Sequence, residues 1–410
     1  MVFMCQVDSY LTNFSSTVTS CEPTESKVEN KNGQLVKTDG YHVELDDTIL
    51  FPEGGGQPDD RGTINNVPVM KISRKGAKAI HFVGKKFEVG ETVKLSVDWD
   101  RRFDHMQQHS AQHLITAIAD GRYGYKTTSW NLGKEISFIE LDVPQTNQDN
   151  INNIESQVNK AILENVPVVV HVTHVGSPLL ESVRTRGLPD DHVGDVRIVE
   201  IKGIEANMCC GTHVSNLSHL QCIKILGTEK GKKGKTNLYF LAGSRVLSYA
   251  GKCYASEKEL TKHLKCSPDQ HVHAVDRTIK QLKLYQKNCT SLLRDIAVLE
   301  ASKFKSSAVN KCFCLHRKEG NIEFMNIIAN EIGLSAFLFL TVGDEKGVGM
   351  FLLSGPEGFV QSCGSKIMEL IGGKGLAKGN RMQGKAEKLQ KKQQAITIID
   401  EFMSKFSSLS

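Results

Sequence analysis

Several features that would direct this chain to a membrane or a secretory pathway are missing from its sequence. Residues 1–10 lack a basic region followed by an apolar run of signal-peptide length. No stretch approaches the roughly 20 consecutive apolar residues that a membrane span needs. We therefore expect a cytoplasmic protein whose 11 cysteines are reduced thiols or metal ligands rather than a disulfide framework.

A strong excess of charge of one sign is also missing. The formal net charge of +5 over 410 residues is too small to indicate nucleic-acid binding by itself. The cations concentrate in two clusters, one at residues 230–235 and one at residues 374–392. Both clusters are candidates for phosphate contact, although each alone is equally consistent with a solvated loop or helix face.

The sequence does contain alternating patterns of short strands and helices, without an internal repeat, which predicts the α+β class. Its length exceeds that of a typical single domain. Residues 1–100 read as a small β-rich domain and residues 101–250 as an α+β domain that begins with a helix over 101–120. Apolar residues recur at a spacing near 3.5 between 272 and 304, so residues 251–305 are predicted to form a helical coiled-coil connector. Residues 306–410 return to mixed α/β character.

A glycine-rich segment, Phe51 to Pro58, interrupts the first domain. Gly54, Gly55 and Gly56 remove side-chain bulk and permit positive φ, so backbone amides could approach a ligand closely. A wide turn between two strands explains the same pattern equally well.

Three histidines are spaced four residues apart on the helix after Arg101: His105, His109 and His113. Neighbours at this spacing lie on one face and can hold a single metal ion, whereas His105 and His113 are separated by roughly 12 Å of helix. His109 therefore belongs to either pair.

A second cluster, Cys209-Cys210-Gly211-Thr212-His213, lies about a hundred residues further on. A thiolate and an imidazole within one turn complete a borderline-soft donor set that is typical of zinc. His171, His174, His219 and Cys222 lack a comparable pattern and are interpreted as structural.

The two clusters resemble a known family. The segment from His109 to Leu114 resembles the HxxxH motif of the alanyl-tRNA synthetase editing domain and of the free-standing AlaX editing proteins, and Cys209 to Val214 resembles their CxxxH motif. Leu50 to Gly62 is similar to the glycine-rich segment of the β-barrel that precedes this domain, and Thr127 to Trp130 to a pocket-lining segment. The arm and the Gly372 to Gly375 run resemble the synthetase C-terminal region, as in long-form AlaX.

The resemblance implies a site and a set of contacts. One Zn²⁺ per chain would be held by His109, His113, Cys209 and His213, with Cys210 at a position where the family more often has glycine. A zinc-bound water would be the catalytic group, and no protein base is assigned. Substrate-pocket residues are predicted by the same resemblance, as are tRNA contacts. The pocket residues are Gly54, Gly55, Gly56, Gln57, Ser110, Gln112, Thr128 and Ser129. The tRNA contacts are Lys232, Lys233, Lys374, Lys378, Arg381 and Lys385.

The implied activity is zinc-dependent hydrolysis of mischarged tRNA(Ala), chiefly seryl-tRNA(Ala) and also glycyl-tRNA(Ala). No aminoacylation motif is recognisable, so editing without charging is expected, with a homodimer through the C-terminal arm. A non-catalytic, zinc-stabilised tRNA-binding protein is the alternative, because four protein ligands usually describe a closed structural zinc. A metallohydrolase for a small ester or amide is a second rival, which salt-insensitive binding would favour.

Overall fold

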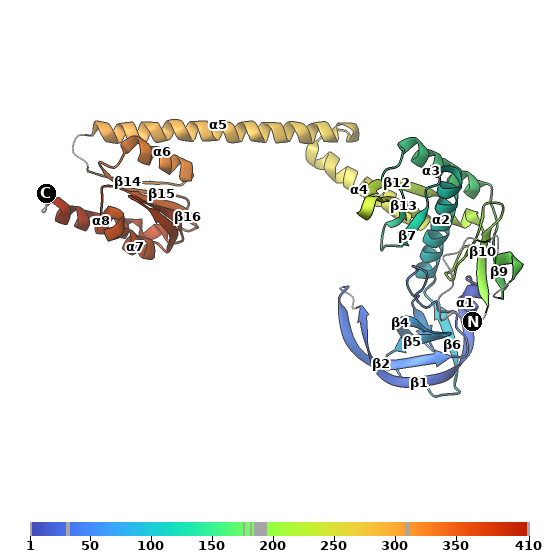
Figure 1. Ribbon diagram of the computed structural model, residues 1–410. Coiled ribbons are helices and arrows are strands. Elements are labelled where there is room, and N and C mark those ends of the chain that lie inside the picture. Colours follow the sequence, from blue (N-terminus) through green and yellow to red (C-terminus); the bar gives the residue numbers. More distant parts are fainter. Residues whose placement is uncertain are drawn as a thin grey trace. The chain divides into compact units, whose positions relative to one another are not determined.

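The protein is described here by a computed structural model that covers residues 2–29, 33–174, 177–180, 183, 195–307 and 311–407 (Figure 1). The chain divides into two compact units, Met1–Lys258 and Glu259–Ser410. The model confirms the α+β class, because both units combine sheets with helices. No helix among the described residues is long and apolar enough to cross a membrane.

The first unit begins with a closed barrel, whose strand order is β1-β2-β5-β4-β3-β6. The barrel closes because β1 pairs antiparallel with β6 as well as with β2, and the β1–β6 partners, such as Asn13 and Ser96, lie far apart in the sequence. Its interior is filled by buried aliphatic residues such as Val43, Ile72 and Leu95. A short helix, α1 (Met4–Val7), precedes it. The strands are β1 (Asn13–Glu29), β2 (Leu35–Leu45), β3 (Gly62–Ile64), β4 (Val67–Lys75), β5 (Lys78–Val83) and β6 (Thr92–Val97).

The longest helix of the first unit, α2 (Trp99–Tyr123), follows the barrel directly. Asp98 caps its N-terminus by accepting a hydrogen bond from the Arg101 N–H, and Gly124 ends it in the left-handed conformation. The guanidinium of Arg102 is fully buried, where it pairs with the Asp60 carboxylate. This ion pair fixes the start of α2 against the barrel.

Two antiparallel sheets complete the first unit around α2 and α3. One has the order β12-β13-β8-β7 and the other the order β11-β10-β9. The helices are α3 (Gln148–Leu163), α4 (Ser244–Leu264), η1 (Pro178–Leu180), η2 (Leu217–Leu220) and η3 (Lys232–Gly234). The strands are β7 (Thr127–Asn131), β8 (Ser137–Leu141), β9 (Val168–Thr173), β10 (Val196–Ile201), β11 (Glu205–Met208), β12 (Ile223–Lys230) and β13 (Thr236–Ala242).

The second unit contains a five-stranded mixed sheet of order β14-β15-β16-β18-β17, in which only β14 and β15 pair in parallel among the described strands. The strands are β14 (Cys312–Arg317), β15 (Phe337–Val342), β16 (Gly349–Ser354), β17 (Gly373–Lys378) and β18 (Arg381–Ala386). The helices are α5 (His271–Ser306), α6 (Ile322–Ile332), α7 (Phe359–Leu370), α8 (Lys392–Ser407), η4 (Pro268–Gln270) and η5 (Leu389–Lys391). The four-domain division expected from the sequence stays a prediction, and α4 runs continuously through residue 251.

Candidate metal centre and adjoining cavity

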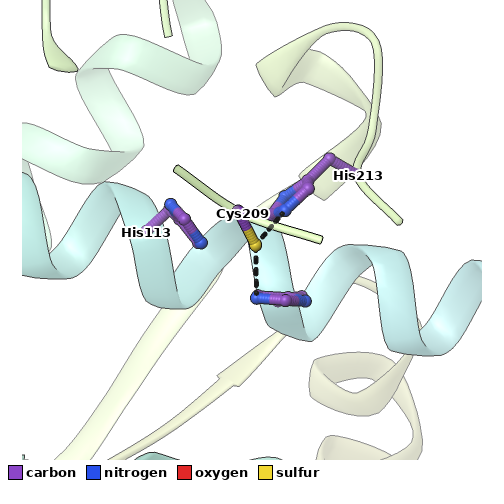
Figure 2. Close-up of side chains that lie close together, drawn as sticks. His113, Cys209 and His213 are labelled. Carbon is purple, nitrogen blue, oxygen red and sulfur yellow. Dashed lines mark hydrogen bonds between the residues drawn. The ribbon is translucent and has the colours of Figure 1, made fainter. Parts of the chain in front are cut away.

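Four donor side chains from two separate segments converge beside α2. His109 and His113 come from the middle of that helix, and Cys209 and His213 come from the loop after β11. Their ligand atoms all lie within 4.8 Å of one another. Figure 2 shows His113 and His213 on either side of the Cys209 thiol. The Cys209 Sγ lies 3.4 Å from His109 Nε2 and 3.2 Å from His213 Nε2. The chemistry and spacing of these donors fit a metal ion of the zinc type.

The loop that carries Cys209 and His213 can pass close to α2 because residue 211 is glycine. A Cβ atom at Gly211 would lie 2.2 Å from His109 Cε1, a distance that real side chains do not adopt. The guanidinium of Arg197 holds the same loop from behind, donating hydrogen bonds to the carbonyl oxygens of Cys209 at 2.8 Å and Gly211 at 2.7 Å. Sequence reasoning missed Arg197, although a cation among the apolar residues Val196, Ile198 and Val199 of β10 was a signal that it is anchored.

In two of the histidines, the ring nitrogen that points away from the cluster contacts a polar side chain. His109 Nδ1 donates to Gln57 Oε1 at 2.9 Å, and the Ser110 hydroxyl lies 3.1 Å from His213 Nδ1. Both contacts turn the Nε2 atom toward the cluster, as second contacts of metal-bound histidines do. Gln57 also bonds the backbone N–H and the hydroxyl of Thr212, so it ties both halves of the site to the glycine loop.

Three residues predicted to line the substrate pocket do not line the cavity that opens beside the cluster. The side chains of Gln57 and Ser110 are buried behind the histidines. Thr128 was expected there as well, yet its hydroxyl points to the Glu140 carboxylate at 2.6 Å. Strand alternation explains this difference, because its neighbours Thr127 and Ser129 line the cavity.

Burial sets the protonation of the donor groups. Desolvation holds the pKa values of His109 and His213 well below their usual range, so both imidazoles are neutral at neutral pH and have a free lone pair. Desolvation also raises the pKa of the Cys210 thiol. That thiol lies against the glycine loop, where a Cβ at Gly55 would be 3.0 Å from its Sγ. Cys209, not Cys210, therefore faces the three imidazoles.

A cavity of about 650 Å³ opens directly beside the cluster. His109, His113 and Cys209 line it, whereas His213 does not. Of the predicted pocket residues, Gly55, Gly56, Gln112 and Ser129 line the cavity, and Gly54 does not. The remaining wall is formed by Thr116, Asp120, Lys126, Thr127, Trp130, Asn207, Met208 and Cys210.

One wall of this cavity carries a short hydrogen-bonded network. The Thr116 hydroxyl accepts a hydrogen bond from Gln112 Nε2 at 2.9 Å and lies 2.9 Å from the Thr127 hydroxyl. Hydroxyl and amide groups that are already oriented can bind a hydroxyl group on a ligand. Sequence reasoning missed Thr116, which is one helical turn beyond Gln112 and on the same face.

The remaining histidines lie outside the cluster. His105 is almost fully buried on α2, and desolvation together with the charge of Arg101 lowers its pKa to about 3. His171 pairs with Glu200 at 2.7 Å, and His219 Nδ1 lies 2.6 Å from the Tyr10 hydroxyl. His174 and Cys222 are also absent from the donor group.

The predicted tRNA contacts fall on two surfaces. Lys232 and Lys233 are exposed in the turn between β12 and β13. Lys374, Lys378, Arg381 and Lys385 lie on the hairpin formed by β17 and β18. In the described residues none of these six cations forms an ion pair, whereas the nearby Lys392 pairs with Glu345.

Comparisons with known proteins first indicate the class of protein to which this site belongs. Residues 196–239, which include Cys209 and His213, match the family described as the threonyl and alanyl tRNA synthetase second additional domain. The whole chain belongs to the family of alanyl-tRNA editing proteins. It is 55% identical to alanyl-tRNA editing protein Aarsd1 of Danio rerio over 98% of both chains, and 53% identical to Aarsd1 of Mus musculus over 98% of both. It is also 28% identical to alanyl-tRNA editing protein AlaX-L of Pyrococcus horikoshii, over 85% of this chain and 89% of the relative.

Proposed function

We propose that this chain is a zinc-dependent hydrolase that removes wrongly attached amino acids from tRNA(Ala). Its relatives are named alanyl-tRNA editing proteins. The observation that carries the proposal is the group of three imidazoles and one thiol at the wall of a cavity of about 650 Å³. In this proposal the terminal adenosine and its amino acid occupy the cavity, and the ester faces His109, His113 and Cys209.

The residues of the site have separate proposed roles in hydrolysis. His109, His113, Cys209 and His213 would hold Zn²⁺, which when bound supplies a Lewis acid for the ester carbonyl and lowers the pKa of water. Gln57 and Ser110 keep the imidazoles oriented. Three of the four donors line the cavity, so this is the side on which a substrate oxygen could add or replace a donor.

The substrate preference follows from the polar wall of the cavity. Seryl-tRNA(Ala) is the main proposed substrate, because the hydroxyls of Thr116 and Thr127 and the amide of Gln112 can hydrogen-bond the serine hydroxyl. Alanine cannot satisfy these groups, which disfavours the correctly charged tRNA. Glycyl-tRNA(Ala) is the second proposed substrate because of the family resemblance alone, since glycine, like alanine, has no hydroxyl for this wall.

The second unit is proposed to supply affinity for tRNA and to join two copies of the chain. Cross-strand partners in the hairpin are Lys374 with Lys385 and Lys378 with Arg381, so four cations share one face. Like charges directly opposite one another destabilise a hairpin, which favours an anionic partner such as a phosphate backbone. Apolar residues exposed along α5, including Leu282 and Leu292, would pack against a second copy.

The proposal is tested by supplying the purified full chain with tRNA(Ala) that carries serine, glycine or alanine. We expect release of serine and glycine, retention of alanine, and no charging of tRNA with any free amino acid. Binding of tRNA without release of serine would identify the alternative, a non-catalytic zinc-stabilised tRNA-binding protein. Binding that does not respond to salt would favour the small-ester hydrolase.

The metal assignment has its own test in two adjacent cysteines. Replacing Cys209 by alanine removes a donor 3.2 Å from His213 Nε2, so the purified variant should contain much less than about one zinc per chain. Cys210→Ala is the matched control, and its zinc content should equal that of the wild type. Zinc loss in Cys210→Ala, with zinc retained in Cys209→Ala, would show that Cys210 is the ligand instead of Cys209.

A further inference from the structure

A second cavity, of about 940 Å³, shares Gly56 and Trp130 with the cavity beside the metal centre. The Trp130 indole lies 4.6 Å from the His109 ring, centroid to centroid, and its Nε1 donates to the Gly55 carbonyl at 3.2 Å. A Cβ at Gly56 would lie 2.6 Å from this Nε1, so only glycine lets the loop hold the indole here. Trp130 therefore stands as a wall that the two cavities have in common.

Two guanidinium groups lie at one carboxylate on the wall of the second cavity. Arg61 pairs with the Asp59 carboxylate at 2.6 Å, and Arg101 lies 3.8 Å from it and donates two hydrogen bonds to the Asp59 carbonyl oxygen at 3.0 and 2.9 Å. The whole wall carries four cations and four anions, so the excess of positive charge is local to this pair. The other charges on the wall are balanced or exposed. Lys134 pairs with Glu29, Arg245 pairs with Asp104, and Glu53 is exposed to solvent.

A buried histidine on the wall lacks a partner. His105 is 3% exposed, and its Nδ1 makes no hydrogen bond to any of the described residues. Burial keeps this imidazole neutral at neutral pH, so one ring nitrogen donates and the other accepts. A buried polar atom without a partner is costly, and a hydrogen-bonding ligand would remove that cost.

We propose that the second cavity binds the nucleotide that precedes the terminal adenosine of tRNA, with its phosphodiester at Arg61 and Arg101 and its base against Trp130. This inference rests on the proposed function, which puts the terminal adenosine on the metal side of Trp130. The tRNA strand must leave the cavity beside the metal centre through a neighbouring cavity. The second cavity offers what a nucleotide needs, namely an aromatic side chain, a pair of guanidinium groups and an unused hydrogen-bonding group.

Trp130 supplies a direct test, because the chain has only two tryptophans, Trp99 and Trp130. In Trp99→Phe, the emission of Trp130 is measured with uncharged tRNA(Ala) that lacks only its terminal adenosine and with the same tRNA shortened by its last two nucleotides. We expect the first tRNA to quench the emission and the shortened tRNA to bind without this effect. An equal response to the two bound tRNAs, or no response to either, would overturn the inference. Neither result requires hydrolysis, so a failure of the proposed activity is recognised separately.

A charge variant tests the phosphate contact. Arg61→Gln leaves Arg101 beside Asp59 and should weaken binding of intact tRNA by about tenfold, with no effect on the shortened tRNA. Lys86→Gln is the control, since Lys86 is an exposed barrel cation paired with Glu88. Zinc content should be unchanged in both variants. If Arg61→Gln weakens the binding of both tRNAs equally, Arg61 acts elsewhere and the assignment is wrong.

Discussion

At the scale of single residues, Gln57 contacts both halves of the candidate metal centre without being one of the four proposed metal ligands. It accepts from His109 Nδ1 and from the Thr212 N–H, and it is fully buried. Gln57→Leu should therefore lower zinc affinity by roughly 10 to 100-fold, which a competition titration with a chromophoric chelator measures. Gln57→Glu keeps an acceptor for His109 and should retain most of the affinity. Equal losses in both variants would contradict the orienting role.

The candidate donors could be predicted from the sequence because each half-site is local. His109 and His113 are one helical turn apart, and Cys209 and His213 are four residues apart, so spacing brings each pair together. The choice of His113 over His105, and of Cys209 over Cys210, came from the family resemblance. The roles of Gln57 and Ser110 depend on contacts across 52 and 103 residues. No local pattern encodes contacts of that length, and for this reason the sequence did not reveal that both residues contact the histidines.

His81 gives the barrel a dependence on pH that is separate from the metal centre. It is fully buried between Thr48 and Val43, and desolvation lowers its pKa from 6.5 to about 4. As the pH falls, His81 therefore takes up a proton in the unfolded chain before it does so in the folded chain. The neutral, buried His81 contributes its full stabilisation above pH 6.5, and this stabilisation is lost between pH 6.5 and about pH 4.

The expected result is a steeper fall of stability in the wild type than in His81→Gln across that window. The difference between their slopes should approach 1.4 kcal/mol per pH unit, from urea unfolding at several pH values, as an order of magnitude. His263→Gln, exposed on α4, is the control and should follow the wild type. Parallel curves for the wild type and His81→Gln would show that His81 does not titrate in this way.

At the scale of elements, the β17 and β18 hairpin is the main candidate for contact with phosphates. Its inner face carries Met382 and Ala386, which are buried, whereas on the other face the three lysines are exposed and Arg381 is half-buried, donating to Asn330 at 2.7 Å. Replacing Lys374, Lys378, Arg381 and Lys385 by glutamine should weaken tRNA binding. The slope of log K against log salt should fall by about 3, because up to four phosphate contacts are lost.

A matched control removes four cations from the same unit and from α4. Lys262, Lys280, Lys283 and Lys287 are exposed on helices, and their replacement by glutamine changes the net charge by the same amount. The salt slope should change little in this control. Identical slopes in the two quadruple variants would show that only total charge matters, and that the hairpin is not a specific contact.

Helix α5 is the element from which self-association is expected. Leu282 is 55% exposed and Leu292 is 62% exposed, at positions that recur along one face of the helix. The full chain should sediment as a dimer, and the double variant Leu282→Glu with Leu292→Glu should sediment as a monomer. Lys280→Gln with Lys287→Gln changes the net charge by the same amount on the opposite face and should stay dimeric. A monomeric wild type would contradict the proposal.

The two long helices could be predicted from the periodicity of apolar residues. The helix expected over 101–120 is α2 (Trp99–Tyr123), and the apolar repeat over 272–304 is α5 (His271–Ser306). Periodicity could not reveal that the basic run after residue 373 contains a hairpin, because Gly375 and Gly384 weaken a strand pattern. It also could not reveal the closure of the barrel, which depends on β1 pairing with β6 across about 80 residues.

At the scale of the whole molecule, the proposed chemistry and the proposed tRNA affinity belong to different units. The four donors and both cavities lie within Met1–Lys258, whereas the hairpin and α5 lie within Glu259–Ser410. A hairpin variant should consequently raise the KM for mischarged tRNA and leave kcat nearly unchanged, while a Cys209 variant should lower kcat.

The most direct test of this account is the release of serine from seryl-tRNA(Ala) by the full chain before and after chelation. The account predicts hydrolysis by the untreated protein, its loss when zinc is removed, and its return when about one equivalent of zinc per chain is restored. Cys209→Ala should stay inactive after the same addition, because one of the four donors is missing. Full hydrolysis by zinc-free protein, with tRNA binding unchanged, would contradict the central role of the metal centre.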